Sequence, residues 1–345
     1  MWSRYNIKIY GIILTMNNKL RILPGLSPTD SIEAFYSKGI KEVYVGFYDD
    51  ISEKQWPVAF NTINRRGEGG SFFGLKDFSL IADKAKKYGI SIYVVFNVNY
   101  TKQQVYWILK SIKQVSKFSS VKGLIVNDIN LLLMLQKQKY KKEIIISTLG
   151  TNLNTYAVSF YKNLGASRVV LDRQLTSLEI LNVLEKFPKI QFEIFFLMAD
   201  GCFFIDGYCT SLHVQETDQN KRYDTTVQST LCMDILSSLN NKNSKDIKFS
   251  YKKMLPYKCN ICTLYYLKSL KNITIKIPNR TITNSDGISI IDVVLKIEKE
   301  LNKKNITLKQ FQSFCKNLLL ENKDIKCNPK ICLCRDLYAK SKNSK

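Results

Sequence analysis

Residues 90–128 read ISIYVVFNVNYTKQQVYWILKSIKQVSKFSSVKGLIVND, and this stretch decides the fold class. Two short runs rich in Ile and Val, 90–98 and 121–128, have the length and composition of buried strands. Between them, residues 102–117 space their apolar side chains as an amphipathic helix does. A strand, a helix and a second strand in this order predict a parallel βαβ unit, because parallel strands need a crossover connection.

The same alternation of apolar runs and amphipathic helices extends in both directions along the chain. Eight strands are predicted, seven of them before residue 200: 20–26, 41–47, 90–98, 121–128, 143–150, 167–172, 190–198 and 273–278. Eight strand–helix units of this length predict an α/β fold, a (β/α)8 barrel of the TIM-barrel type.

The predicted domain organisation follows from the long gap before the eighth strand. We expect an N-terminal extension at 1–19 and a barrel at 20–287. A cysteine-rich insertion, 200–272, follows strand seven, and a helical C-terminal tail with further cysteines covers 288–345. The insertion would rise from the carboxyl end of the barrel, where barrel active sites are built.

The charge balance is strongly basic, with 52 Lys and Arg against 29 Asp and Glu and a net charge of +23. Lys side chains are spread over many predicted helix faces, which is typical of solvated surfaces. A polyanionic partner, RNA in particular, is the alternative. No segment holds the roughly 20 apolar residues of a spanning helix, so we expect a soluble, cytoplasmic protein without a membrane span.

Polar residues at the ends of predicted strands are candidates for substrate binding. Asn97, Asp128 and Arg173 stand at or near carboxyl ends of strands, together with Ser147, Thr148 and Asp172. Glu193 and Lys276 fall within strands and are expected to point into the barrel. In a barrel these positions converge on one mouth, so they predict a substrate cavity.

All nine cysteines lie between residues 202 and 334. In a reducing compartment, clustered thiols indicate metal or redox chemistry more often than disulfides. Four thiolates can hold an iron–sulfur cluster or zinc. Zinc sites usually show two close pairs, and here only Cys259 and Cys262 form a CxxC, so the wide spacing favours a cluster. Cys315, Cys327, Cys332 and Cys334 are candidates for a second metal site.

Hydrolytic chemistry has little support, because His213 is the single histidine of the chain. A two-histidine zinc protease motif is therefore excluded. A peptidase or peptide-binding protein with a structural metal site remains the alternative to a redox protein.

Two segments resemble the peptidase U32 family. GCFFIDGYCTS (201–211) is similar to the family's Gly-x-x-Cys…Gly-x-Cys-x-x-Ser signature, and KCNICTLYYLKSLKNITIKIPNR (258–280) resembles its Cys-containing helix and Lys-Ile-x-Gly-Arg strand. LPGLSPTDSIEAFYSKGIKEVYVGF (23–47) resembles the family's opening strand and helix. The chain departs from the pattern at KIPNR and in the segment before Cys232.

The resemblance implies a barrel-like fold and, for several members, a [4Fe–4S] cluster with a part in oxygen-independent hydroxylation of quinone precursors or RNA bases. Carried over to this chain, it implies Cys202, Cys209, Cys232 and Cys259 as cluster ligands, with Cys262 as the alternate. The activity expected is an Fe–S-dependent modification of a small molecule, RNA or peptide. An electron donor protein and a family-related partner subunit are the partners it implies.

Overall fold

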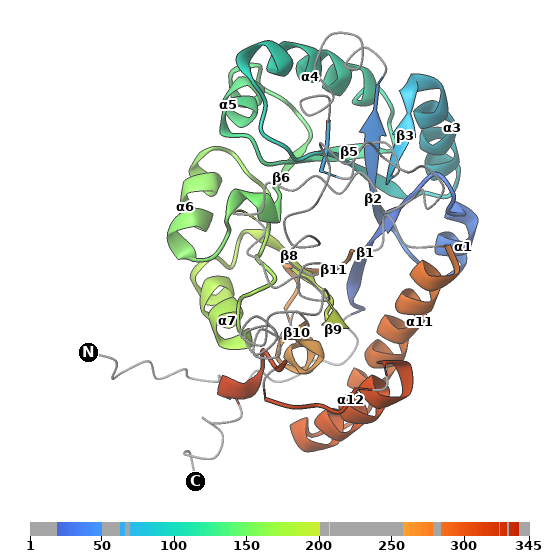
Figure 1. Cartoon of the computed structure of the whole chain (residues 1–345), viewed down its shortest axis with the longest axis vertical. Helices are drawn as coiled ribbons and strands as arrows, with labels where there is room; N and C mark the ends of the chain where they lie inside the picture. Colours follow the sequence, from blue (N-terminus) through green and yellow to red (C-terminus); the bar gives the residue numbers. More distant parts are fainter. Residues whose placement is uncertain are drawn as a thin grey trace, which may run out of the picture.

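A computed structural model describes residues 19–49, 63–65, 70–200, 207, 258–268, 270–278, 284–323, 325–329 and 331–337. Its centre is a ring of parallel strands with helices outside it (Figure 1). The eight strands of the ring are β1 (Arg21–Leu26), β2 (Glu42–Tyr48), β4 (Ser91–Phe96), β5 (Val121–Val126), β6 (Glu143–Ile146), β7 (Arg168–Val170), β8 (Gln191–Phe195) and β11 (Ile273–Ile277).

The ring is closed, because β1 pairs with β11 on one side and with β2 on the other. The remaining pairs follow chain order from β2 through β4, β5, β6, β7 and β8 to β11, and all are parallel. The predicted (β/α)8 barrel and its eight strands are therefore confirmed.

Helices connect successive strands on the outside of the ring. They are α1 (Ile32–Ser37), α3 (Gly74–Lys87), α4 (Lys102–Val115), α5 (Ile129–Lys137), α6 (Thr155–Asn163) and α7 (Ser177–Lys186). Side-chain caps set where several of them begin: Thr101 and Thr176 each form a capping box with the residue three positions on. These caps satisfy backbone N–H groups that have no partner in the first helical turn.

Two longer helices follow the eighth strand, α11 (Asn284–Leu301) and α12 (Leu308–Lys323). In Figure 1, α11 lies beside α1 and so occupies the last place in the ring of helices. Lys38 Nζ pairs with Asp292 Oδ1 at 2.6 Å, and the backbone N–H of Leu20 donates to Glu298 Oε1 at 2.5 Å. These contacts fix α11 to the start of the barrel.

The structure differs from the prediction around a Gly-rich segment. Residues 71–73 form an additional strand, β3 (Ser71–Phe73), which pairs in parallel with β2 through Gly46 and Ser71. A Cβ at Gly46 would lie 2.6 Å from the carbonyl oxygen of Gly70, so only glycine permits this approach. The predicted strand 143–150 is also shorter, because Ser147 caps a 3₁₀ turn instead of continuing β6.

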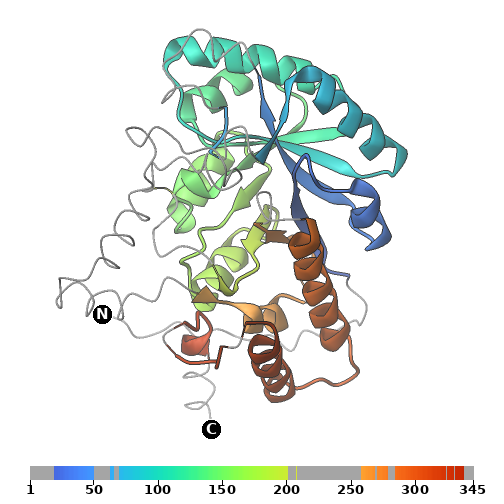
Figure 2. The same cartoon turned by 45° about the vertical axis from the view of Figure 1, so that its right-hand side comes forward.

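The end of the chain returns to the barrel. Residues 331–337 lie close to α7 and to the two short strands β9 (Met198–Asp200) and β10 (Lys258–Cys259) (Figure 2). The backbone N–H of Ser177 donates to the carbonyl of Leu333 at 2.9 Å. Among the described helices, none is both long and apolar enough to cross a bilayer.

Candidate functional site

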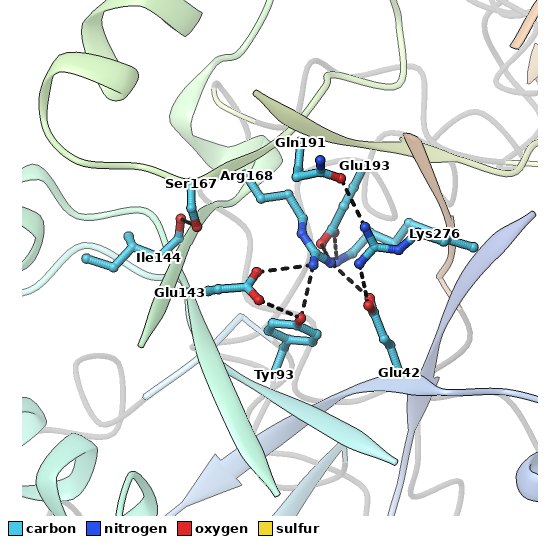
Figure 3. A network of polar contacts seen from close by, with 10 residues as sticks. Glu42, Tyr93, Glu143, Ile144, Ser167, Arg168, Gln191, Glu193 and Lys276 are labelled. Atoms are coloured by element: carbon cyan, nitrogen blue, oxygen red, sulfur yellow. Dashed lines mark hydrogen bonds and ion pairs between the residues drawn. The ribbon is translucent and has the colours of Figure 1, made fainter. Parts of the chain in front are cut away.

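A network of charged side chains fills the amino-terminal end of the barrel. Arg168, at the first position of β7, is 1 % exposed and lies among three carboxylates (Figure 3). Its guanidinium contacts Glu42 at 3.1 Å, Glu143 at 3.1 Å and Glu193 at 3.4 Å, and it donates to the Tyr93 hydroxyl at 3.0 Å. Since buried charges need partners, the five strands that carry these groups, β2, β4, β6, β7 and β8, are held together here.

Arg168 keeps its positive charge although its side chain is buried. Burial alone would lower the pKa of the guanidinium, but the nearby carboxylates, Glu193 and Glu42 above all, outweigh it and raise the pKa. Arg168 therefore remains a cation inside the barrel, and its charge stays matched to the carboxylates around it.

Glu193 and Lys276 point into the barrel, as expected from their positions within strands. Lys276 Nζ lies 2.6 Å from Glu193 Oε2 and 4.2 Å from the centre of the Tyr44 ring. Glu193 is fully buried and also meets Arg168. Each of the two charges thus has a partner inside the protein, and their geometry is that of a buried ion pair.

An apolar layer lies between this network and the mouth. Its members face the barrel axis from several strands, and one comes from the end of the chain: Leu23, Tyr44, Tyr93, Val95, Ile125, Ile145, Val170, Phe195, Leu197 and Leu333. The layer fills the barrel as a core, as in other barrels of this size. Leu333 is the contribution of the C-terminal segment to it.

The carboxyl end of the barrel brings together part of the predicted cavity. Asn97 follows β4, accepts a hydrogen bond from the backbone N–H of Arg65 at 3.1 Å and donates to Ser147 Oγ at 3.4 Å. The Arg173 guanidinium lies 4.6 Å from the centre of the Phe195 ring. Both side chains are at the mouth, where a substrate would enter.

Asp128 has a structural role in the same region. One carboxylate oxygen accepts from the N–H of Leu131 at 2.6 Å and caps α5, and the other accepts from the N–H of Tyr100 at 3.2 Å. The side chain is 8 % exposed. Asp128 therefore joins the start of a helix to the loop after β4.

One residue of the GCFFIDGYC segment is described, and it lies at the mouth. A Cβ at Gly207 would overlap the side chain of Thr151, in the loop after β6. Gly207 stands between Cys202 and Cys209 in the sequence. Gly207 is thus in close contact with the carboxyl end of the barrel.

The cysteines fall into three situations. Cys202, Cys209 and Cys232 lie outside the described residues. Cys315 is buried in the core on α12, and Cys327 is exposed. Four others lie close together at the mouth, and we call them the mouth thiols: Cys259, Cys262, Cys332 and Cys334.

Cys334 is at the centre of the mouth thiols. Its thiol hydrogen-bonds with the thiols of Cys262 and Cys332, and the contact with Cys262 is the first cause that raises the pKa of Cys334 to about 11. Burial raises the pKa of Cys259. Within the described ranges, no three His, Cys, Asp or Glu side chains are already arranged as a group that could hold a metal ion.

Sequence reasoning did not find Arg168, Glu42, Glu143 or the approach of the C-terminal cysteines to Cys259. A signal for the first three exists, since each is a charged residue at the first position of an otherwise apolar strand. Because side chains alternate along a strand, such residues share a face with the inward positions two residues on. The approach of the C-terminal cysteines has no comparable local signal.

Comparison with known proteins gives a family. A sequence model of the peptidase family U32 matches residues 28–321, which is most of the chain and includes seven of the eight barrel strands, with β1 just before its start.

Three curated relatives are tRNA hydroxylation proteins. Protein P1 of Bacillus subtilis is 30% identical over 150 residues, covering 43% of this chain and 35% of the relative. Protein P of Haemophilus influenzae is 28% identical over 140 residues, covering 40% of this chain and 30% of the relative. The alignments thus span about a third of the length of these relatives.

Among solved structures, a U32 peptidase is similar with a TM-score of 0.39 and 14% identity, covering 52% of this chain and 70% of that one. A xylose isomerase domain protein of Salmonella typhimurium has a TM-score of 0.43 and 10% identity, covering 82% of this chain and 99% of that one. Similarities of this size carry no argument, and the barrel rests on its own strand pairings.

Proposed function

Because the chain belongs to peptidase family U32, we propose that it takes part in a hydroxylation-related modification of RNA, with tRNA as the substrate. The observation that carries the proposal is the similarity to tRNA hydroxylation proteins of three bacteria. The product of such a reaction carries a hydroxyl group where the nucleoside had hydrogen.

The charge of the chain supports a polyanionic substrate. A net charge of +23 raises the local concentration of RNA, whose phosphates release counterions when basic side chains bind them. At the mouth, Arg173 has the planar guanidinium that suits phosphate or a base, and Asn97 offers amide groups for hydrogen bonds. We assign to these two residues the binding and orientation of the nucleotide.

We propose a [4Fe–4S] cluster as the cofactor, with Cys202, Cys209, Cys232 and Cys259 as ligands and zinc as the alternative. Cys259 is 9 % exposed and lies at the mouth, and Gly207, which stands between Cys202 and Cys209 in the sequence, lies at the same end. A cluster held by four thiolates transfers electrons. A separate electron donor protein and a family-related partner subunit are the partners proposed for this role. Because hydroxylation adds an oxygen atom and oxidises the nucleoside by two electrons, the reaction also needs an oxygen-atom donor or, with water as the oxygen source, an electron acceptor.

Side chains of this chain would position the nucleotide at the mouth and keep water away from the apolar layer beneath it. Phe195 and Leu197 are buried members of the apolar layer beneath the mouth. The Arg168 network lies at the opposite end of the barrel, and we assign it to stability because barrel active sites are built at the carboxyl end.

The test compares tRNA nucleosides from three strains: one that carries the gene, one from which it is deleted, and the deletion strain complemented with Cys202→Ser/Cys209→Ser/Cys232→Ser. Mass spectrometry is expected to find a hydroxylated nucleoside in the first strain and its unhydroxylated precursor in the other two. Identical nucleosides in all three would overturn the proposal. Peptide cleavage by the purified protein would favour the peptidase alternative.

A further inference from the structure

Three consecutive helices on the outside of the barrel, α4, α5 and α6, carry no negative charge (Figure 1). The chain from 101 to 171, which contains them, has two carboxylates, Asp128 and Glu143, beside ten Lys. Asp128 is buried and caps α5, and Glu143 belongs to the Arg168 network. The lysines of this side of the barrel are therefore not balanced by exposed acids of the same helices.

The lack of acidic residues extends to the first helical turns, where the helix dipole favours them. In α1, α3 and α7 the first turn holds Glu33, Asp77 and Glu179. The first turns of α4, α5 and α6 hold no acidic residue, and α4 begins with Lys102. Because the dipole opposes a cation at that position, the stability of the helix does not account for Lys102.

The basic side chains of α4 form one stripe. Its exposed members follow one another at spacings of four, four and three residues, which places them on one face of the helix: Lys102, Tyr106, Lys110 and Lys113. Among the described residues, no carboxylate forms an ion pair with these lysines. Asp49 meets α4 at Ser111, which is buried and faces inward. Since α4 follows β4, the stripe begins at the mouth, and it runs along the barrel for about 16 Å.

Exposed aromatic rings share this surface with the lysines. Tyr106 on α4 is 70 % exposed, and Tyr156 on α6 is 82 % exposed. The rings of Tyr106 and Trp107 meet edge to face, and Lys110 Nζ lies 5.4 Å from the centre of the Trp107 ring. Cations and exposed rings together are the side chains with which proteins hold RNA, because phosphates bind the cations while unpaired bases stack on the rings.

We infer that the outer face of α4, α5 and α6 binds the backbone and unpaired bases of the tRNA while the mouth holds the nucleotide that is modified. The inference rests on the proposed function and names where the rest of the same substrate lies. Lysines of α4 neutralise phosphates, and Tyr106 and Tyr156 stack on bases. Because the stripe begins at the mouth, an RNA strand can follow it while one nucleotide reaches Asn97.

Helix α11 provides a matched control. Lys296 and Lys299 on this helix and Lys304 just after it are exposed, but Glu298 and Glu300 stand among them. In Figure 1, α11 lies away from α4, on another side of the barrel. If the net charge alone attracted RNA, the three lysines of each set would contribute equally.

The experiment measures tRNA binding to the full-length protein by fluorescence anisotropy over a range of salt concentrations. Lys102→Gln/Lys110→Gln/Lys113→Gln is expected to weaken binding at least about tenfold and to make the slope of log K against log salt less steep by about 2–3, because phosphate contacts are lost. Lys296→Gln/Lys299→Gln/Lys304→Gln is expected to change the affinity less than about twofold. Equal losses in the two variants, or no loss in the first, would overturn the inference.

The aromatic rings are tested separately with the same assay. Tyr106→Ala/Tyr156→Ala is expected to weaken binding about fivefold or more, as the loss of base stacking does. Tyr106→Phe/Tyr156→Phe keeps both rings and is expected to bind as the wild type does, as is Tyr36→Ala, which removes an exposed ring on α1. Displacement of the tRNA by polyglutamate at the same concentration of charge would assign the face to an acidic protein instead.

A footprint of the wild type needs no variant and covers the case in which a variant does not fold. Lysines are acetylated with and without tRNA, and the modified positions are mapped by mass spectrometry. The tRNA is expected to protect the three lysines of α4 and to leave the three control lysines reactive. Protection elsewhere, together with a hydroxylated nucleoside that depends on the gene, would overturn the docking face and leave the proposed function standing. Protection on α4 without such a nucleoside would do the reverse.

Discussion

At the scale of single residues, Arg168 decides the balance of charge inside the barrel. Its guanidinium is the cation that meets Glu42, Glu143 and Glu193 together. Removing one member of a buried ionic group leaves the remaining charges without a partner. The loss in free energy of unfolding is then larger than the net contribution of the intact group. Lys276 would then be the remaining cation against Glu193.

We expect Arg168→Met to lower the free energy of unfolding by about 3–5 kcal/mol, because three carboxylates lose a buried partner. Urea denaturation measures the change. Arg21→Met is the matched control: Arg21 also pairs with Glu42, but its side chain is 39% exposed, so its loss should cost less than about 1 kcal/mol. Equal losses in the two variants would contradict the role assigned to Arg168.

Asp128 provides a second prediction at this scale. Asp128→Ala should cost about 1–3 kcal/mol of stability, because the buried N–H groups of Leu131 and Tyr100 both lose their acceptor. Asp128→Asn should cost less, since Asn keeps the cap on Leu131 and loses only the acceptor of the Tyr100 N–H. Both are measured by thermal unfolding. Loss of tRNA modification in a stable Asp128→Asn protein would show instead that the charge of Asp128 serves the substrate.

At the scale of elements, the segment 331–337 is the least expected part of the structure. It forms a β-bridge with β10, accepts a hydrogen bond from the first residue of α7 and places Leu333 in the barrel's inner layer. Residues 331–337 are thus attached to the barrel both by backbone hydrogen bonds and by the packing of a side chain. The C-terminal end of the chain thereby becomes part of the mouth.

Leu333→Ala is expected to lower the free energy of unfolding by about 2–5 kcal/mol, because it leaves a cavity among packed side chains. Leu320→Ala on α12, where the side chain is 44% exposed, should change it by no more than about 0.5 kcal/mol. Urea denaturation of both variants gives the comparison. A small effect at Leu333 would mean that the segment does not pack against the barrel in solution.

The elements also show what could be predicted from sequence. Strands such as 121–128 were recognisable because a parallel strand buried on both faces is almost continuously apolar. β3 was not, since it has three residues and follows a run of glycines. Glu193 and Lys276 were placed inside the barrel correctly, because position within a strand determines direction, but their pairing depends on which strands are neighbours.

The grouping of the cysteines in space could not be predicted from their spacing in the sequence. Spacing suggested that Cys332 and Cys334 belong with Cys315 and Cys327. In space Cys332 and Cys334 lie beside Cys259 and Cys262, and Cys327 is near enough to Cys332 for the two thiols to interact. Sequence distance does not report the return of a chain to the barrel, because that return depends on long-range packing. Whether either group binds metal stays a prediction.

At the scale of the whole molecule, the side chains assigned to stability and those proposed to act on a substrate lie at opposite ends of the barrel. The ionic network lies at the amino-terminal end, and Asn97, Arg173 and the mouth thiols lie at the carboxyl end. The family match covers nearly the whole barrel, whereas the tRNA hydroxylation proteins align with less than half of the chain.

The net charge gives a prediction for the complete protein. Binding of tRNA should weaken at least about tenfold between about 50 and 200 mM salt, because each phosphate that a Lys or Arg neutralises releases counterions. Fluorescence anisotropy with labelled tRNA follows the change. An affinity that does not depend on salt would contradict the contribution assigned to the basic surface.

The central claim is that the cysteines of this barrel serve redox modification rather than hydrolysis. The most direct measurement is an anaerobic UV–visible spectrum of freshly purified full-length protein, with analysis of iron, sulfide and zinc. The account predicts a broad band near ~400 nm and about four irons and four sulfides per chain, as a [4Fe–4S] cluster requires. Zinc without iron or sulfide would contradict the redox account and leave the peptidase alternative.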